Sequence, residues 1–475
     1  MLGFSMIETK LKGISFYKYL IEEGYYFNKE LIENYLLSLK VKPFVILTGN
    51  SGTGKTKLSQ LFAKFLSENS SGEENVVSTD VRVGKSSTSG GWSISRKVME
   101  ELIPVMDLEK EKHLIYVDGI PDGEAKFNLN TRLFFSSDDV KRHLADLREE
   151  DPDQKISLKI IIDNVCDSGY QIVPVGANWT DNTNIIGYYN AITEEYQSTP
   201  TYGLIKEAID DSINPYFLIL DEMNLSHVER YFADFLSAIE SKEPIPIFGK
   251  SNESLTLPDN LFIIGTVNVD ETTYMFSPKV LDRANTIEFE TLSVSDYINL
   301  NLDNDDFKGD INYLQSPLID SDISNLNIVD LKEILSEISC TGGNLLQVLT
   351  NELNSFQSKL KPAGFDFGFR VINEILRFMV VAWRYENSPD NWDNWQRYFD
   401  AQIKQKILPK LHGSQKAIGN VLNDLFNSCL INSDNNEQAK LFDLSENNCK
   451  YYTSALKLQN MAKVLSDQRY VSFIN

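Results

Sequence analysis

The chain has 475 residues, of which 42% are hydrophobic and 24% charged, a composition typical of a globular protein with several domains. Its formal net charge of −23 opposes general binding to nucleic acid, so we expect any DNA contact to use a local basic patch or a partner. Four scattered cysteines without a C-x-x-C pair argue against a zinc site or a disulfide framework and favour a reducing cytoplasm. No apolar run reaches the length of a membrane span, and the N-terminus lacks the apolar segment of a signal peptide.

The first 42 residues have a mostly helical pattern, which is clearest over residues 27–39. An apolar run at residues 44–48 follows, then a glycine loop, then a helical run over residues 58–66. The loop matches G-x-x-x-x-G-K-T with Gly49, Asn50, Ser51, Gly52, Thr53, Gly54, Lys55 and Thr56. Strand, glycine loop and helix together are the context of a phosphate-binding P-loop.

The residue types of this loop suit nucleotide binding. Its glycines let backbone amides turn toward a phosphate chain, and the helix that starts near Lys55 adds the positive end of its dipole. Lys55 is placed for the β- and γ-phosphates, and Thr56 supplies a hydroxyl for Mg²⁺. The sequence therefore predicts a nucleoside-triphosphate site here.

Residues 69–155 differ from the rest of the chain. Ser- and Gly-rich breaks interrupt them, and strands are predicted at residues 113–117 and 132–135, with a helix over 138–148. We interpret 69–155 as an inserted α+β module, with a decorated surface loop as the alternative. Residues 121–126 spell P-D-x-E-x-K, but nuclease acids of this pattern lie on neighbouring strands, so Asp-Gly predicts a turn here.

Residues 156–290 return to a pattern of buried strands, with apolar runs at 159–162 and 171–175. The run at 216–220 ends in Asp221 and Glu222, at the carboxyl edge where α/β sheets bind ligands. Asp221 is expected to hold Mg²⁺, and Glu222 to polarise the water that attacks the γ-phosphate.

Another buried strand, at residues 261–267, ends in Asn268, which is suited to hydrogen-bond the attacking water or the γ-phosphate. Between the two strands, residues 228–240 have the spacing of one helix. From residue 291 the pattern is largely helical, and Trp383, Trp392 and Trp395 are interpreted as packing residues. The main predicted helices are 331–338, 345–360, 370–384, 395–407 and 455–465.

On these residues the chain resembles the AAA+ superfamily and, within it, the McrB-like NTPase subunit of modification-dependent restriction systems. The resemblance rests on residues 49–56, 178–189, 220–240, 264–289 and 365–370. It implies an α/β fold: a P-loop AAA+ core with a parallel sheet, an inserted α+β module and a C-terminal helical lid. The implied division is an N-terminal helical segment (1–42), the core (43–68 and 156–290), the module (69–155) and the lid and C-terminal region (291–475).

The resemblance also implies roles for single residues. Lys55 and Thr56 match the Walker A pair, and Asp221 and Glu222 match Walker B. Asn268 matches the polar sensor. Arg283, on a predicted helix, matches the arginine finger that reaches the neighbouring subunit's γ-phosphate, which implies a homo-hexamer. Arg370 resembles the second sensor of the lid.

The chain departs from the family where M-N-x-x-D-R is common, because residues 267–272 read V-N-V-D-E-T and lack the arginine. N-K-x-D is absent, so both GTP and ATP stay open. No target-reading domain precedes the P-loop, so target choice is expected in residues 69–155 or in another protein. A small basic patch is predicted there from Arg82, Lys85, Arg96 and Lys97.

The implied function is a cytoplasmic motor subunit of a restriction or antiphage complex, which hydrolyses nucleotide with Mg²⁺ and drives a McrC-like nuclease partner. The alternatives are a MoxR-like remodeller that matures or unfolds a protein client, and a nucleotide-switched scaffold with little turnover. An intact Glu222 argues against the scaffold.

Overall fold

The computed structural model forms two compact units, each described here by itself. The module unit lies within Ser67–Ser168, and the core unit consists of Ile14–Leu66 and Gly169–Asn475. The described residues are 15–70, 75–81, 84–85, 92–94, 113–117, 120–125, 133–134, 137–150, 156–162, 169–211, 214–247, 254–269, 274–290, 307–315, 326–431 and 437–474, with residues 295, 298 and 318.

A five-stranded sheet in the order β16-β1-β15-β12-β9 forms the centre of the core unit, and all its neighbouring strands are parallel. The strands β1, β12 and β15 are buried along nearly their whole length, which is why their sequences are apolar runs without alternation. The predicted parallel α/β core is confirmed. In chain order the strands are β1 (Phe44–Gly49), β9 (Tyr170–Pro174), β12 (Tyr216–Asp221), β15 (Leu261–Asn268) and β16 (Asn285–Glu288).

Helices cover both faces of this sheet. Phe62 packs edge-on against Phe217 of β12, while Phe232 contacts Phe44 of β1. Phe44 of β1 and Leu218 of β12 are both paired with Ile263 of β15, so these three side chains point to the same face of the sheet. Phe217, one residue before Leu218, therefore points to the opposite face from Phe44. The helices are α1 (Phe16–Glu22), α2 (Lys29–Val41), α3 (Lys55–Ser70), α7 (Pro200–Asp210), α8 (Val228–Tyr231), α9 (Ala233–Ser241) and α10 (Pro278–Leu281).

The single helix predicted over residues 228–240 is wrong, because it is divided into α8 and α9. Phe232, between them, has φ −110° and ψ 11°, outside the helical region. Its ring stacks on Phe235 at a centroid distance of 4.8 Å and also contacts Phe44. Packing of this ring against the sheet accompanies the break in the helical pattern.

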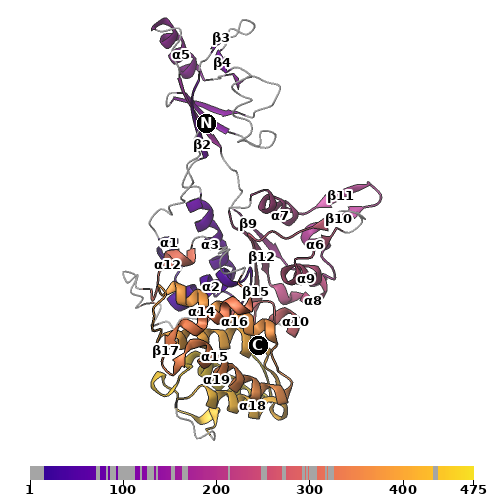
Figure 1. The fold of residues 1–475 in the computed structure, drawn as a ribbon. Coiled ribbons are helices and arrows are strands. Elements are labelled where there is room, and N and C mark those ends of the chain that lie inside the picture. Colours follow the sequence, from indigo (N-terminus) through magenta and orange to yellow (C-terminus); the bar gives the residue numbers. More distant parts are fainter. Residues whose placement is uncertain are drawn as a thin grey trace. The chain divides into compact units, whose positions relative to one another are not determined.

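The C-terminal part of the core unit is helical, drawn in orange and yellow in Figure 1. All five predicted helices are present, although the fourth continues after α17 as a π-helix, Ile403–Ile407. The packing role predicted for Trp392 and Trp395 is confirmed by their burial. The helices are α12 (Ile311–Gln315), α14 (Ile328–Glu337), α15 (Leu345–Leu360), α16 (Phe369–Tyr385), α17 (Trp395–Gln402), α18 (Gln415–Ser428) and α19 (Tyr452–Gln468).

Short elements complete the core unit. The stretch 178–189, on which the family resemblance partly rests, contains a helical turn and the first strand of a hairpin. These elements are α6 (Thr183–Ile186), β10 (Gly187–Asn190), β11 (Glu195–Ser198), β13 (Ile245–Pro246), β14 (Ser254–Leu255), β17 (Ser339–Cys340), β18 (Gly343–Asn344), β19 (His412–Ser414) and β20 (Tyr470–Ser472).

A buried ion cluster joins the helical region to the sheet. Glu374 of α16 pairs with Lys42, in the short link between α2 and β1, and with Lys406, whose Nζ lies 2.5 Å from Glu374 Oε2. Burial raises the pKa of Glu374, but Lys406 and Lys42 outweigh burial and lower that pKa below its ordinary value. Burial lowers the pKa of Lys42 to about 8, in spite of the nearby Glu374.

The described residues of the module unit form antiparallel sheets and a helix, as expected for an α+β module. Its four-stranded sheet has the order β2-β8-β5-β6, and its three-stranded sheet the order β3-β4-β7. The elements are β2 (Asn75–Val81), β3 (Gly84–Lys85), β4 (Trp92–Ile94), β5 (His113–Val117), β6 (Ile120–Ala125), β7 (Leu133–Phe134), α5 (Asp138–Glu150) and β8 (Ile156–Ile162).

Two predictions about this region are wrong. Residues 159–162 were assigned to the core sheet, but they belong to β8, which pairs with β2 and β5 of the module sheet. The turn predicted at Asp122-Gly123 is a strand instead. Within β6, Pro121 and Gly123 pair with successive residues of β5, which leaves Asp122 as the extra residue of a bulge.

Two further properties concern membranes and thiols. Within the described part of the chain, no helix combines the length and the apolar character that crossing a bilayer requires. Cys340, Cys429 and Cys449 are free, buried thiols. Burial, reinforced by the negative charge of Asp400, raises the pKa of the Cys449 thiol to about 11.

Candidate functional site

The glycine loop connects β1 to α3 at the carboxyl edge of the core sheet. Gly49, Gly52 and Gly54 have φ values of 151°, 78° and 88°, which side-chain-bearing residues rarely adopt. A Cβ on Gly49 would also lie 2.6 Å from the backbone oxygen of Phe289. The glycines predicted to shape a phosphate loop therefore occupy positions that require glycine.

Lys55 is buried and folded back over this loop. Its Nζ donates hydrogen bonds to the backbone oxygens of Gly49 (2.8 Å) and Asn50 (2.7 Å), and lies 3.3 Å from Thr53 Oγ1. The ammonium group is thus held inside the curve of the loop by polar atoms. Phosphate oxygens would be stronger, charged acceptors at the same place.

The two residues predicted to hold Mg²⁺ are in contact. Thr56 Oγ1 donates a hydrogen bond to Asp221 Oδ1 at 2.7 Å, although the two residues are 165 positions apart. Thr266 Oγ1 donates to the same oxygen, also at 2.7 Å. Hydroxyl and carboxylate oxygens are the ligands that Mg²⁺ prefers, so this pair fits the ion.

The predicted water-activating residues are also paired. Asn268 Nδ2 donates to Glu222 Oε1 at 3.0 Å. Glu222 has a left-handed backbone, with φ 54° and ψ 49°, and its N–H donates to Thr266 Oγ1 at 3.1 Å. A non-glycine residue in this conformation is strained, and such strain occurs at functional sites.

Thr266 belongs to the site although its position inside an apolar strand predicts only a packing role. Its hydroxyl bonds both Asp221 and the backbone of Glu222, so it fixes the two acids relative to one another. One signal was available: Thr266 precedes Asn268 by two positions in a strand, so both side chains point to the same face.

Sheet order explains why these residues meet. The strand β15 lies between β1 and β12, with Gly49 opposite Asn268 and Leu220 opposite Gly265. Because all three strands are parallel, the loop, the acids and Asn268 follow the same carboxyl edge. Residues 270–272, where the sequence departs from the family's M-N-x-x-D-R motif, lie outside the described residues. The side chains of the predicted basic patch also lie outside them.

Arg283 and Arg370 are not at this edge. Arg283 was predicted on a helix, but it lies in the turn between α10 and β16. Arg370, which the family resemblance implies to be the second sensor of the lid, lies in the first turn of α16; the structure does not bring it to the P-loop of its own subunit. Both arginines instead pair with Glu240.

The two arginines line a hollow of about 330 Å³, which we call the amino-edge hollow. Pro43 and Phe262, at the beginnings of β1 and β15, also line it, so it lies at the edge opposite the P-loop. Six lining residues are cationic and three acidic, giving +3 in a chain whose net charge is −23. These are Lys40, Lys42, Lys242, Arg283, Arg370 and Arg377, with Glu240, Asp259 and Glu374.

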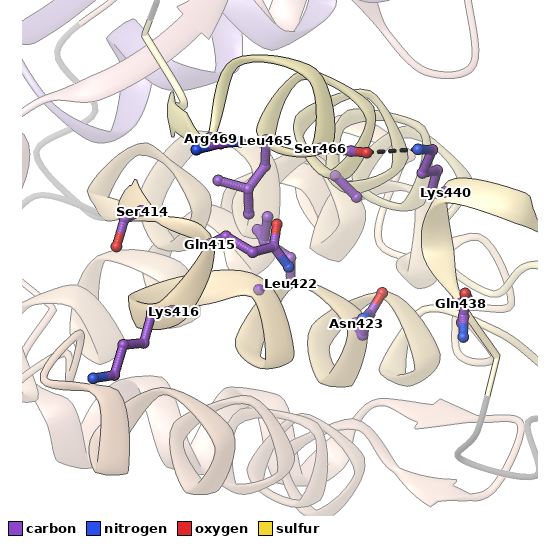
Figure 2. Close-up of a pocket in the computed structure, with 12 residues that line it drawn as sticks. Ser414, Gln415, Lys416, Leu422, Asn423, Gln438, Lys440, Leu465, Ser466 and Arg469 are labelled. Carbon is purple, nitrogen blue, oxygen red and sulfur yellow. Dashed lines mark hydrogen bonds between the residues drawn. The ribbon is translucent and has the colours of Figure 1, made fainter.

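A larger hollow, of about 580 Å³, lies between α18 and α19. Figure 2 shows that its polar side chains do not converge: Lys440 is directed at Ser466, to which it donates a hydrogen bond of 2.5 Å, while Lys416 extends away. This hollow therefore does not present the grouped donors of a phosphate site.

Comparisons with known proteins leave the family open. A model described as a domain of unknown function (DUF8727) matches residues 322–470, in the helical region. No curated protein matches the chain. Among solved structures, the chain is similar to that of a "putative ATPase" from Cytophaga hutchinsonii, at 14% identity and a TM-score of 0.30, over 51% of this chain and 69% of that chain. So low a TM-score carries no functional argument.

Proposed function

We propose that the chain is a P-loop NTPase that hydrolyses GTP or ATP with Mg²⁺. The observation that carries this proposal is the cluster at the carboxyl edge, where the Thr56–Asp221 pair and the Asn268–Glu222 pair lie beside the glycine loop. A turn with a stray lysine and threonine would not need a carboxylate 165 positions away to meet that threonine.

Each residue has a defined task in this reaction. The β- and γ-phosphate oxygens replace the carbonyls that now accept from Lys55. Thr56 and Asp221 would hold Mg²⁺, which would supply positive charge beside those phosphates. Glu222 accepts the proton of the attacking water, and Asn268 keeps the Glu222 carboxylate oriented toward that water.

We further propose that the active form is a ring, most simply a homo-hexamer, in which Arg283 reaches the nucleotide of the neighbouring subunit. Its position at the amino edge supports this proposal. The strand β1 spans roughly 20 Å at about 3.3 Å per residue, so Arg283 is too far from its own P-loop to act there.

The family resemblance supports a biological role as the cytoplasmic motor subunit of a McrBC-like restriction or antiphage complex. In this role nucleotide hydrolysis drives a McrC-like nuclease subunit, and DNA is contacted through that partner or a local patch. Co-purification with a nuclease encoded by an adjacent reading frame, together with nucleotide turnover stimulated by it, is the expected result. Stimulation by an unfolded client protein instead would favour a MoxR-like remodeller.

The variant Glu222→Gln tests the hydrolysis itself. It should bind nucleotide like the wild type, yet lose about 10²–10⁴-fold in turnover, because the base that positions water is gone. Glu229→Gln, on α8, is the matched control, since it also neutralises a partly exposed glutamate seven residues along. Wild-type turnover in Glu222→Gln would remove Glu222 from the mechanism.

Mixed assemblies test the ring. Arg283→Ala and Glu222→Gln should each be inactive alone, since an arginine finger is worth roughly 10³–10⁵ in rate. Mixing them should restore part of the activity, because an intact Glu222 then sits beside an intact Arg283. Assemblies that exchange subunits but stay inactive at every ratio would exclude action between subunits.

A further inference from the structure

One carboxylate in the amino-edge hollow joins two arginines from distant parts of the chain. Glu240, at the end of α9, pairs through Oε2 with Arg283 and through Oε1 with Arg370. Arg283 belongs to the core beside β16, whereas Arg370 belongs to α16 of the helical region. Glu240 is therefore a direct link between the two parts.

The charges of the hollow favour this link. The guanidinium groups of Arg283 and Arg370 would repel each other if no carboxylate lay between them. The hollow also has more cationic than acidic lining residues, so few other anions are near. The other two lining acids are engaged elsewhere: Asp259 pairs with Lys242, and Glu374 pairs with Lys42 and Lys406. Among the acids that line the hollow, only Glu240 holds the two arginines in place.

The Arg283 guanidinium is held in place, but not all of its N–H donors are used. Its NH1 donates to the backbone oxygen of Lys279 at 2.7 Å, and its NH2 is taken by Glu240. Its buried Nε has no hydrogen-bond partner within the described structure. The guanidinium is thus held at two points. Its NH1 and NH2 groups each carry a second N–H that can donate to an acceptor such as a phosphate oxygen, whereas the buried Nε is out of reach of one.

We propose that Glu240 is a positioning residue for Arg283 and that it couples the finger to the helical region. Arg370 acts on Arg283 through Glu240: a shift of α16 moves Arg370, the shared carboxylate follows, and the Arg283 guanidinium is re-aimed. Arg370 has no contact with nucleotide in this scheme. The inference rests on the proposed function, because it assumes that Arg283 serves the neighbouring subunit's γ-phosphate.

The test measures turnover as a function of nucleotide concentration for Glu240→Gln, Arg370→Ala and the double variant. Glu240→Gln should lower kcat by about 10- to 100-fold with little change in KM, because a displacement of about 1 Å costs up to about 100-fold. Arg370→Ala should act in the same direction. The double variant should be no slower than Glu240→Gln, because both changes break one linkage.

Two controls separate positioning from general damage. Asp259→Asn neutralises another acid of the same hollow, which pairs with Lys242 and not with an arginine, so its turnover should stay within about twofold of wild type. Binding of a fluorescent nucleotide analogue, measured in the Glu222→Gln background, should be unchanged by Arg370→Ala.

Other results would overturn the inference. Equal losses in Glu240→Gln and Asp259→Asn would show a general electrostatic effect. Weaker nucleotide binding in Arg370→Ala, or multiplied losses in the double variant, would show that Arg370 acts independently of Glu240. If Arg283→Ala abolishes turnover while Glu240→Gln keeps it, the inference alone fails; if Arg283→Ala keeps turnover, the finger assignment in the proposed function fails with it.

Discussion

Replacing Thr266 by valine should disable the site without altering its shape. The Thr266 hydroxyl donates to Asp221 Oδ1 at 2.7 Å and accepts from the Glu222 N–H at 3.1 Å. Valine has nearly the same volume, so no cavity forms and the loss is that of two hydrogen bonds, one of them to a carboxylate. We expect the free energy of unfolding to fall by about 2–4 kcal/mol.

The Thr266→Val variant should also lose turnover, beyond what its loss of stability explains. Without the Thr266 hydroxyl, the strained backbone of Glu222 loses the acceptor of its N–H, and a shift of about 1 Å in the carboxylate costs up to about 100-fold in rate. Thr266→Ser, which keeps the hydroxyl, should retain most activity. The assays are urea unfolding and phosphate release at saturating nucleotide and Mg²⁺.

A matched control lies two strands away. Thr286 of β16 is as buried as Thr266, but its hydroxyl has no hydrogen-bond partner among the described residues. Thr286→Val should therefore leave turnover unchanged and stability equal or slightly higher. If both valine variants behave alike, the role assigned to Thr266 is refuted.

Three further predictions concern other parts of the chain. Replacing residues 72–167 by a Gly/Ser linker should preserve basal hydrolysis, whereas replacing only 72–152 leaves β8 without β2 and β5 and should cause aggregation, measured by size-exclusion chromatography. The lowered pKa of Glu374 means that its contribution to stability is fully present above about pH 4.5 and is lost as the pH falls through the lower pKa of the folded state, so the difference in unfolding free energy between wild type and Glu374→Gln should stay constant from pH 7 down to about pH 5 and narrow only below about pH 4.5. The Cys449 thiol, with its pKa raised to about 11, should react with iodoacetamide at pH 8 far more slowly in the folded chain than in urea, as followed by mass spectrometry.

The carboxyl-edge site could be predicted from the sequence because its signals are local. The glycine loop lies between a strand and a helix, and Glu222 and Asn268 each follow a buried strand. In a parallel sheet the carboxyl ends of the strands share one edge, so both residues are expected at that edge. The Asn268–Glu222 hydrogen bond itself depends on the adjacency of β12 and β15, which only the structure shows. The role of Thr266 could not be predicted, because a threonine inside an apolar strand cannot be distinguished by sequence pattern from a residue that only packs.

The remaining differences depend on contacts between distant segments. The pairing of β8 with the module sheet depends on β2 and β5, which local pattern does not identify. The break at Phe232 accompanies its packing on Phe44. The place of Arg370 depends on how α16 packs on the core, and its motif gave no information on that packing.

The order of strands in the core sheet has a consequence for synthesis of the chain. The two neighbours of β1 are β15 and β16, and β15 begins about 210 residues after β1 ends. Ribosomes add roughly 5–20 residues per second, so this apolar strand waits roughly 10–40 s for its first neighbour. The module sheet, whose strands all lie within residues 75–162, is complete well before then. The nascent core therefore exposes an unpaired hydrophobic strand for tens of seconds, and yield of the full-length chain should depend on chaperone supply during translation.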